Sequence, residues 1–262
     1  MTGPLLDGAV AVVTGAGTGI GREIALRLAA DGADLVLAGR STGPMDEVAA
    51  AVREAGRRAL VVPLDLRDAA SVTKAADAAF DEFGRVDVLV NNSGVGGPSA
   101  PLWEIDPDDW EDTFRVNVTG TFLVCRAFLP RMIEAGSGSV VVIGSMTGKR
   151  PLVNRTPYAA SKTALIGLVR TLAWDTGPHG VRVNLVSPGP VEGARIQWVL
   201  EQQAAARGIS FEEAQADFTS GSPLHRLVPP GDVADVVAYL ASPRSASITG
   251  DDINVSAGLA MY

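Results

Sequence analysis

Short apolar runs recur along the whole chain, and longer stretches of a different periodicity separate them. The runs are nearly continuous in Val, Leu, Ile and Ala, which is typical of parallel strands that are buried on both faces. This pattern predicts seven strands, at residues 9–13, 33–39, 59–64, 86–90, 139–144, 181–186 and 253–256.

The intervening stretches carry apolar residues at helical spacing. In the first of them, Ile20, Ile24 and Leu28 fall on one face of a helix. Residues 69–83 and 107–134 follow the same pattern, and each stretch ends near a glycine that can terminate a helix. Alternating strands and helices predict a parallel sheet with helices on both faces. We therefore expect an α/β fold with a doubly wound, Rossmann-type sheet of about seven parallel strands.

One segment interrupts this alternation. Residues 190–230 combine a long charged helical pattern with a Ser- and Pro-containing tail, and they follow the sixth apolar run. Because open α/β sheets bind ligands beyond the carboxyl ends of their strands, we interpret this insertion as a substrate lid. The alternative is a helical excursion used only for subunit packing. Since neither a linker nor an internal repeat divides residues 1–262, we expect one domain that combines cofactor binding and catalysis.

The balance of charge narrows the functional classes. A net charge of −8 opposes binding to nucleic acid, which requires a basic surface, and gives no attraction to an anionic membrane. No apolar run approaches the ~20 residues of a membrane span. The first residues lack the basic and apolar regions of a signal peptide, so we expect a cytoplasmic protein.

Few residues are suited to disulfide or metal chemistry. Cys125 is the only cysteine, and its helical spacing among apolar residues favours a buried hydrophobe over a reactive thiol. His179 and His225 are the only histidines, which is too few for a multi-histidine site. We therefore expect no metal.

A glycine-rich segment joins the first predicted strand to the first predicted helix. Its sequence, TGAGTGIG at 14–21, does not match the dinucleotide fingerprint G-x-G-x-x-G. Glycines nevertheless allow the backbone to turn tightly and approach a pyrophosphate, and the following helix N-terminus favours its negative charge. The strand–loop–helix setting therefore indicates dinucleotide binding.

The end of the second predicted strand bears on which dinucleotide binds. The dinucleotide fold commonly has an acidic residue there for the ribose hydroxyls, whereas this chain has Gly39 and Arg40. A guanidinium offers a planar cation to a 2′-phosphate, which a carboxylate would repel. We therefore favour NADP(H) over NAD(H). The alternatives are a solvated loop arginine and stacking of Arg40 on the adenine of NAD(H).

Tyr158 and Lys162 lie four residues apart in a predicted helix, so their side chains share one face. Taken alone, the pair is compatible with ordinary surface residues, because most Tyr and Lys side chains on helices pack or are solvated. Other motifs decide whether the pair is catalytic or only part of the surface.

These motifs occur in order across nearly the whole chain. They are Thr14, Gly15, Gly19 and Gly21 in T-G-x-x-x-G-x-G, NNSG at 91–94, Asn117 in VNVTG, Ser145 in IGSMTG, Tyr158-x-x-x-Lys162, SPGPV at 187–191, and the C-terminal ITG…INVSAG. Ser93 and Ser256 stand where alanine and aspartate are usual. With this set, the sequence resembles the short-chain dehydrogenase/reductase family.

The resemblance implies a catalytic role for four residues. Tyr158 would be the general acid/base, with the Lys162 cation favouring its ionised form. Ser145 would hydrogen-bond the substrate oxygen, much as an oxyanion hole does. Lys162 would also bind the nicotinamide ribose, and Asn117 would position a water that links Lys162 to solvent. The cofactor would carry the hydride.

The resemblance also implies a cofactor site, with Asp65 and Leu66 beside the adenine and Asn91 and Gly94 lining the cleft. The full set is Gly15, Thr18, Gly19, Ile20, Arg40, Asp65, Leu66, Asn91, Gly94, Tyr158, Lys162, Pro188, Gly189 and Val191.

The substrate is less closely defined by the sequence. Arg155, three residues before Tyr158, could hold a carboxylate as in family members that act on hydroxy acids, and Trp198 could line the pocket. The 197–224 insertion is similar to that of 3-hydroxybutyrate dehydrogenases, but Gly96 and Thr147 replace their polar carboxylate contacts. Arg155 as a surface residue is the alternative.

The leading hypothesis is an NADP(H)-dependent dehydrogenase or reductase of secondary alcohols and ketones. An NAD(H)-dependent dehydrogenase of a hydroxy acid or other alcohol is a second hypothesis. A dinucleotide-binding sensor or scaffold without turnover is a third, and the complete set of four catalytic residues argues against it. Relatives usually form tetramers, so we expect a homotetramer through the helices at about 107–134 and 157–176 and through the C-terminal strand region.

Overall fold

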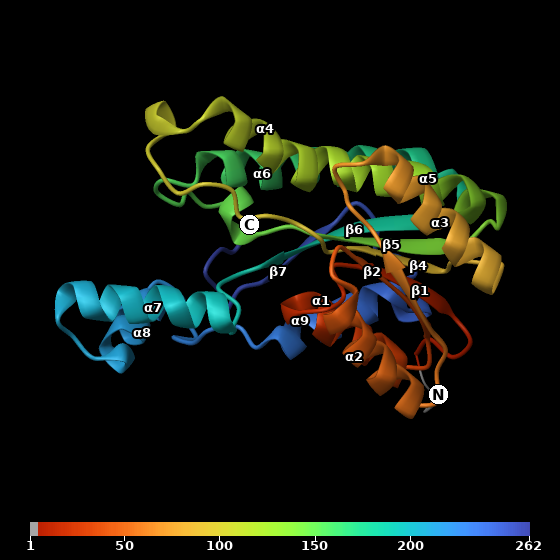
Figure 1. Cartoon of the computed structure of the whole chain (residues 1–262), viewed down its shortest axis with the longest axis horizontal. Helices are drawn as coiled ribbons and strands as arrows, with labels where there is room; N and C mark the ends of the chain where they lie inside the picture. The colour runs from red at the N-terminus through yellow and green to blue at the C-terminus, as the bar shows by residue number, and fades with distance from the viewer. Residues whose placement is uncertain (1–4) are drawn as a thin grey trace.

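Seven parallel strands form one sheet at the centre of the molecule (Figure 1). The computed structural model describes residues 5–262, apart from the side chains of Arg195, Gln202, Gln203 and Ala206. The strands lie in the order β3-β2-β1-β4-β5-β6-β7, and every neighbouring pair is parallel. Their bounds are β1 Val10–Thr14, β2 Asp34–Gly39, β3 Ala59–Pro63, β4 Val88–Asn91, β5 Gly138–Ile143, β6 Val181–Pro188 and β7 Asp252–Val255.

Helices cover both faces of the sheet (Figure 1). One face packs against α1 (Gly19–Ala30), α2 (Thr42–Glu54) and α9 (Pro230–Ala241). The other packs against α3 (Ala69–Phe83), α5 (Gly120–Glu134) and α6 (Thr156–Thr176). The remaining α-helices are α4 (Pro107–Phe114), α7 (Ala194–Arg207) and α8 (Phe211–Thr219). This is the doubly wound fold that the apolar periodicity predicts.

The core consists of two apolar layers because successive strand residues point to opposite faces. In β4, Leu89 joins the layer beneath α3, α5 and α6, while Val88 and Val90 join the layer beneath α1, α2 and α9. All three are at most 1% exposed. Both faces therefore require apolar side chains, which explains why these strands are uniformly apolar in sequence.

The predicted helix over residues 107–134 is wrong in one respect, because it is not a continuous α-helix. A π-helical turn, Arg115–Thr119, separates α4 from α5. Asn117 lies within this turn, and its side chain bonds both backbone groups of Val95 on the neighbouring loop. An inserted π-turn redirects a side chain without ending the helix, and such turns are frequent at functional sites. Hydrophobic periodicity alone does not reveal it.

The 190–230 segment leaves the sheet as a separate helical pair. Helices α7 and α8 pack against each other beyond the end of β6 (Figure 1). A capping box between Ser210 and Glu213 begins α8. A parallel bridge between Val191 and Val228 closes the excursion where it departs from the fold.

Candidate active site

The glycine-rich loop between β1 and α1 adopts a conformation that side chains would oppose. Gly15 and Gly19 have φ angles of +68° and +54°, in the left-handed region that glycine adopts without strain. A Cβ at Gly21 would lie 2.1 Å from the carbonyl oxygen of Gly15. Thr18 and Gly19 are exposed at the start of α1, and Ile20 packs partly against the core.

Two polar residues hold this loop in place. The Asn92 side chain donates to the carbonyl oxygens of Thr14, at 2.9 Å, and Gly15, at 3.3 Å. The Thr14 hydroxyl in turn accepts from the backbone N–H groups of Asn92 and Ser93, each at 3.0 Å. Asn92 was missed as a site residue in the sequence. The signal was its place directly after β4, which lies beside β1 in a doubly wound sheet.

The residues expected around the adenine do not all face the same way. Leu66 is 6% exposed and its side chain contributes to the core against Gly120. Asn91 is 4% exposed and donates to the sulfur of Cys125 at 3.5 Å. Only the backbone of these two residues is therefore placed to face a ligand. Asp65 is half-buried, and one oxygen accepts from the backbone N–H of Arg67.

Arg40 follows β2 at the same edge, with its side chain exposed. Arg67 forms a bidentate pair with Asp112, at 2.7 and 2.8 Å, and this pair is the main reason that the pKa of Asp112 is lowered. Arg115 and Arg40 lower the pKa of Asp112 further through their charges. Three guanidinium groups thus act on one region of the surface, where Asp112 and Asp65 pair with Arg67.

Asn117 fixes the loop after β4 by using both ends of its side-chain amide. Its oxygen accepts from the backbone N–H of Val95 at 2.8 Å, and its nitrogen donates to the Val95 carbonyl at 3.0 Å. The same nitrogen donates to the Ser161 hydroxyl at 3.0 Å, which donates to the Tyr158 carbonyl. Ser161 is 0% exposed. It connects Asn117 to the helix that carries Tyr158, a role that the sequence did not suggest.

Lys162 is buried beside Asn117 and Gly94. A Cβ at Gly94 would lie 3.1 Å from the Asn117 oxygen and 3.6 Å from the Lys162 Nζ. The ammonium donates to the Ile143 carbonyl at 2.8 Å and lies 5.9 Å from the centroid of the Tyr158 ring. Burial lowers the pKa of Lys162 from 10.5 to about 8, because a low-dielectric site disfavours the charged form.

Ser145 begins a short turn directly after β5. Its hydroxyl oxygen accepts from the backbone N–H of Thr147 at 3.1 Å, which leaves the hydroxyl proton available to a substrate oxygen. Both Ser145 and Tyr158 are partly exposed. Since Lys162 bonds Ile143, two residues before Ser145, one hydrogen bond ties the tyrosine helix to the strand end that carries the serine.

The segment after β6 passes close to the end of β7. Gly189 donates its backbone N–H to the Val255 carbonyl at 2.9 Å, and a Cβ there would lie 2.8 Å from the Cα of Ser256. Pro188 is buried at the end of β6, and Val191 pairs with Val228 at the base of the helical excursion. These residues therefore lie at the same carboxyl edge of the sheet as Ser145.

The two residues considered for substrate contact differ in their surroundings. Arg155 donates to the Gly96 carbonyl at 2.5 Å, and its guanidinium carbon lies 5.4 Å from the centroid of the Tyr158 ring. This places a cation directly beside the tyrosine. Trp198 is 61% exposed on α7, and no hydrogen bond or ring contact joins it to the catalytic residues in the described part of the chain.

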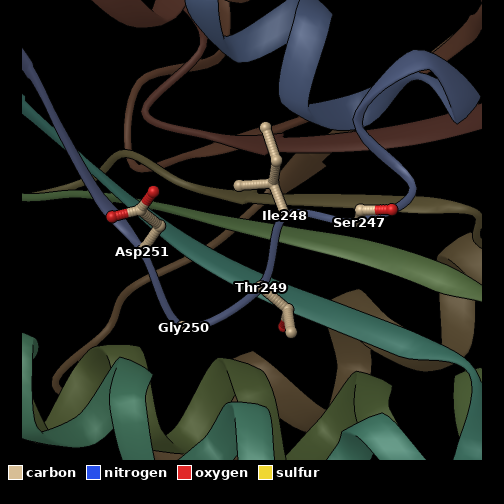
Figure 2. Close-up of a pocket in the computed structure, with 5 residues that line it drawn as sticks. All are labelled: Ser247, Ile248, Thr249, Gly250 and Asp251. Atoms are coloured by element: carbon tan, nitrogen blue, oxygen red, sulfur yellow. The ribbon is translucent and has the colours of Figure 1, made fainter.

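Two shallow hollows lie away from these residues. One, of about 240 Å³, is lined by Ser247 to Asp251 (Figure 2). Thr249 and Gly250 in its wall bond the backbone of Val183, near the amino end of β6, so this loop is an extension of the sheet. The other, of about 380 Å³, is lined by Trp110, Glu111, Phe114, Arg115 and Thr119.

Within residues 5–262, no group of three His, Cys, Asp or Glu side chains is placed to hold a metal ion. In the same range, no helix combines the length and the apolar character needed to cross a bilayer.

The geometry of the carboxyl edge fits a dinucleotide. Gly15 and Gly21 approach each other so closely that a side chain would fill the space, and α1 begins at that point. Backbone N–H groups at a helix N-terminus bind phosphate well. Lys162 bonds Ile143 at the end of β5, which is separated from β1 by β4 in the sheet. Ligands bind in this crevice in open α/β sheets.

The buried ammonium makes a prediction about stability and pH. Below pH 8, both folded and unfolded states carry the Lys162 proton, and the folded state bears the full cost of burying the charge. Above that pH the folded state loses the proton first, so stability rises with pH up to 10.5. Relative to Lys162→Met, the wild-type protein should gain about 2 kcal/mol between pH 7 and pH 9.5.

Urea unfolding of the ligand-free proteins at the two pH values measures this difference. Lys74→Met is the matched control, because Lys74 is exposed on α3 and keeps its hydration in the folded state. An identical pH dependence for wild type and Lys162→Met would contradict the prediction.

Comparison with known proteins supports the same assignment. Residues 15–260 match the family model described as enoyl-(acyl carrier protein) reductase. A putative ketoacyl reductase of Streptomyces coelicolor is 37% identical over 258 residues, covering 98% of both chains.

Two solved structures share the fold over almost the whole chain. A variant of actinorhodin polyketide ketoreductase with NADPH has a TM-score of 0.91 at 37% identity, covering 97% of this chain and 98% of its own. NAD⁺-bound xylitol dehydrogenase has a TM-score of 0.90 at 32% identity, covering 97% and 99%. With these matches and with its Ser145, Tyr158 and Lys162, the chain belongs to the short-chain dehydrogenase/reductase family of nicotinamide-dependent oxidoreductases.

Proposed function

We propose that this protein interconverts a secondary alcohol and its ketone with NADP(H) as the preferred cofactor. The observation that carries the proposal is the contact of the buried Lys162 ammonium with the Ile143 carbonyl, 2.8 Å away. This bond brings the tyrosine helix to the end of β5, where Ser145 begins its turn. A general acid/base and a hydrogen-bond donor for the same substrate oxygen are thereby held together.

Each catalytic residue has a distinct task in the proposed reaction. Tyr158 donates its phenolic proton to the carbonyl oxygen during reduction and accepts it back during oxidation. The Ser145 hydroxyl donates a hydrogen bond to that oxygen as negative charge develops on it. Lys162 holds the nicotinamide ribose and places a cation 5.9 Å from the centroid of the Tyr158 ring. The bound nicotinamide cofactor supplies or accepts the hydride.

Asn117 has a positioning task supported by its hydrogen bonds. Its side-chain amide is held by Val95 and Ser161, and we place a water molecule at its backbone carbonyl. The Thr121 hydroxyl already donates to this carbonyl at 2.8 Å, and a carbonyl oxygen can accept a second hydrogen bond. We therefore assign to Asn117 the water that relays the proton from Lys162.

The choice of NADP(H) rests on the charges around Arg40. Arg40, Arg67 and Arg115 all act on Asp112, and Arg40 is the one that follows Gly39 at the end of β2, with its side chain exposed. A 2′-phosphate is recognised by such a guanidinium fork. The comparisons include both an NADPH-bound and an NAD⁺-bound relative. NAD(H), with Arg40 stacked on the adenine, is therefore the alternative.

Arg155 supports a second candidate, a dehydrogenase of hydroxy acids. Its guanidinium lies 5.4 Å from the ring centroid of Tyr158 and is half-buried. A carboxylate on the substrate could accept a bidentate hydrogen bond there. In this scheme α7 and α8 form the lid, and Trp198 contacts the body of the substrate.

We also propose that the enzyme is a cytoplasmic homotetramer. Phe122 on α5 is 49% exposed and Trp174 on α6 is 85% exposed, so these helices carry apolar side chains that a subunit contact would cover. Light scattering on the purified protein measures the assembly directly, and a monomer mass would exclude it.

The first prediction from the proposed function tests the acid/base role. Tyr158→Phe keeps the ring and removes the hydroxyl, so kcat should fall about 100- to 10,000-fold. Cofactor affinity should stay nearly unchanged, because the glycine loop and Lys162 remain. Steady-state rates of ketone reduction, together with fluorescence titration of the cofactor, separate the two effects. A variant that retains most of its kcat would rule out Tyr158 as the acid.

The second prediction concerns Arg40. Wild-type protein should bind NADPH more tightly than NADH in side-by-side fluorescence titrations at one ionic strength. Arg40→Ala should weaken NADPH binding about tenfold or more, since a charge-assisted contact to the phosphate is lost. NADH binding should hardly change. Arg58→Ala, at another exposed arginine, is the control. An equal loss of affinity for NADPH and NADH would show that Arg40 does not bind the 2′-phosphate.

The third prediction concerns Arg155. Arg155→Ala should raise KM for a keto acid about tenfold or more while leaving KM for its methyl ester nearly unchanged. The ester is the matched control, because it differs from the acid only in the charge. An equal rise for both substrates would show that Arg155 acts through its bond to Gly96 and does not hold a carboxylate.

A further inference from the structure

A second buried lysine lies near the active site and takes no part in the scheme above. Lys149 follows the turn that Ser145 begins, and its side chain is only 7% exposed. Its ammonium lies 2.8 Å from a carboxylate oxygen of Asp252, whose side chain is also 7% exposed. The ammonium also donates to the side-chain oxygen of Asn254 at 2.5 Å.

The geometry of β7 explains why both partners meet this lysine. Asp252 and Asn254 are two residues apart in a strand, so their side chains point to the same face of the sheet. Ile253 and Val255, between and beyond them, pack towards the opposite layer. The amino end of β7 therefore presents an anion and an amide to the loop after β5.

Asp252 also contacts the strand that leads to the nicotinamide side of the cleft. Its other carboxylate oxygen accepts from the Ser187 hydroxyl at 2.7 Å. Ser187 directly precedes Pro188 and Gly189, and its hydroxyl lies 3.0 Å from where a Cβ of Gly144 would stand. Gly144 directly precedes Ser145. One carboxylate thus connects the Ser145 turn with the Pro188–Gly189 segment.

We propose that Lys149 and Asp252 are positioning residues, which hold the Ser145 turn and the Pro188–Gly189 segment in register across the active site. The proposal rests on the proposed function, in which both segments border the reacting carbon. An ion pair in a low-dielectric site is weakly screened, and the hydrogen bonds to Asn254 and from Ser187 fix where its two groups lie. Neither residue touches the reacting atoms.

The energetics of buried pairs give a way to separate positioning from stability. Removing one partner leaves an uncompensated buried charge and is strongly destabilising, whereas replacing both partners with uncharged residues of similar size is much less so. Lys149→Met leaves the buried Asp252 carboxylate without a cation beside it. The double variant Lys149→Met/Asp252→Asn removes both charges, and the new amide oxygen can still accept from Ser187.

Three proteins are therefore compared with wild type: Lys149→Met, the double variant, and Glu82→Gln. Glu82 pairs with Arg58 on the surface, far along the sequence from both segments, and serves as the control. Tm and urea unfolding report stability. Fluorescence titration reports NADPH affinity, and steady-state reduction of a ketone reports kcat and KM.

We expect Lys149→Met to lower Tm and the double variant to recover most of that loss. In both, kcat should fall about 10- to 100-fold, because a misplacement of roughly 1 Å at the reacting centre costs about this much. NADPH affinity should change little, since the glycine loop is untouched. Recovery of kcat together with Tm in the double variant would overturn the proposal, as would an unchanged kcat in Lys149→Met.

Hydrogen–deuterium exchange provides a readout that needs no turnover. In the double variant, peptides covering 145–149 and 187–191 should exchange faster together, while peptides from α1 should match wild type. If wild type reduces no ketone but this coupled change occurs, the proposed function fails and the register role stands. If neither peptide changes, the register role fails whatever the activity.

Discussion

The hydrogen bond from the Lys162 ammonium to the Ile143 carbonyl is the contact on which the active site depends. It joins α6 to the end of β5, and it does so from a position that is 5% exposed to water. Burying a cation is costly unless its hydrogen-bonding needs are met. The Ile143 carbonyl meets one of these needs, and the ammonium lies beside Gly94 and the Tyr158 ring.

The surrounding residues limit the movement of this ammonium. The Asn117 side chain forms hydrogen bonds with the Val95 backbone and the Ser161 hydroxyl. Asn117 lies in the π-turn, which redirects its side chain from the regular helical path. Gly94 leaves the space in front of the ammonium open, since any side chain would contact the Asn117 oxygen and Lys162. The loop after β4, the π-turn and α6 thus form one hydrogen-bonded unit behind the catalytic face.

The sequence predicts the fold well because both layers of the core demand apolar strands. The run at 86–90 predicts β4 to within two residues, and the run at 181–186 stops short of Pro188 because Ser187 and Pro188 lack apolar periodicity. Pairing with β7, not hydrophobicity, extends β6 to that point. The π-turn escaped prediction for the same reason, because its cause is a side-chain contact with Val95, 22 residues away.

The candidate site is predictable from sequence where the chemistry depends on residue type. It is less predictable where the role depends on which way a side chain points. Ser145, Tyr158 and Lys162 could be named from the resemblance that the ordered motifs carry, and the structure places them at one edge of the sheet. Leu66 and Asn91 were also named, yet their side chains point into the core. Asn92 and Lys149 were not named. Asn92 holds the glycine loop and Lys149 pairs with Asp252, and both contacts join segments that are far apart in the sequence.

The bridge between Val191 and Val228 has a consequence for how such proteins diversify. The Glu192 N–H donates to the Val228 carbonyl, and the Val228 N–H donates to the Pro190 carbonyl, each at 2.9 Å. The chain therefore returns to within one strand spacing of its departure point before α9 begins. Everything between is a closed excursion, and its last residues contact the segment after β7, where the Leu224 N–H donates to the Ala257 carbonyl at 3.3 Å. A change in the length of α7 or α8 therefore has a fixed start and end point, which the bridge sets and the two helices do not.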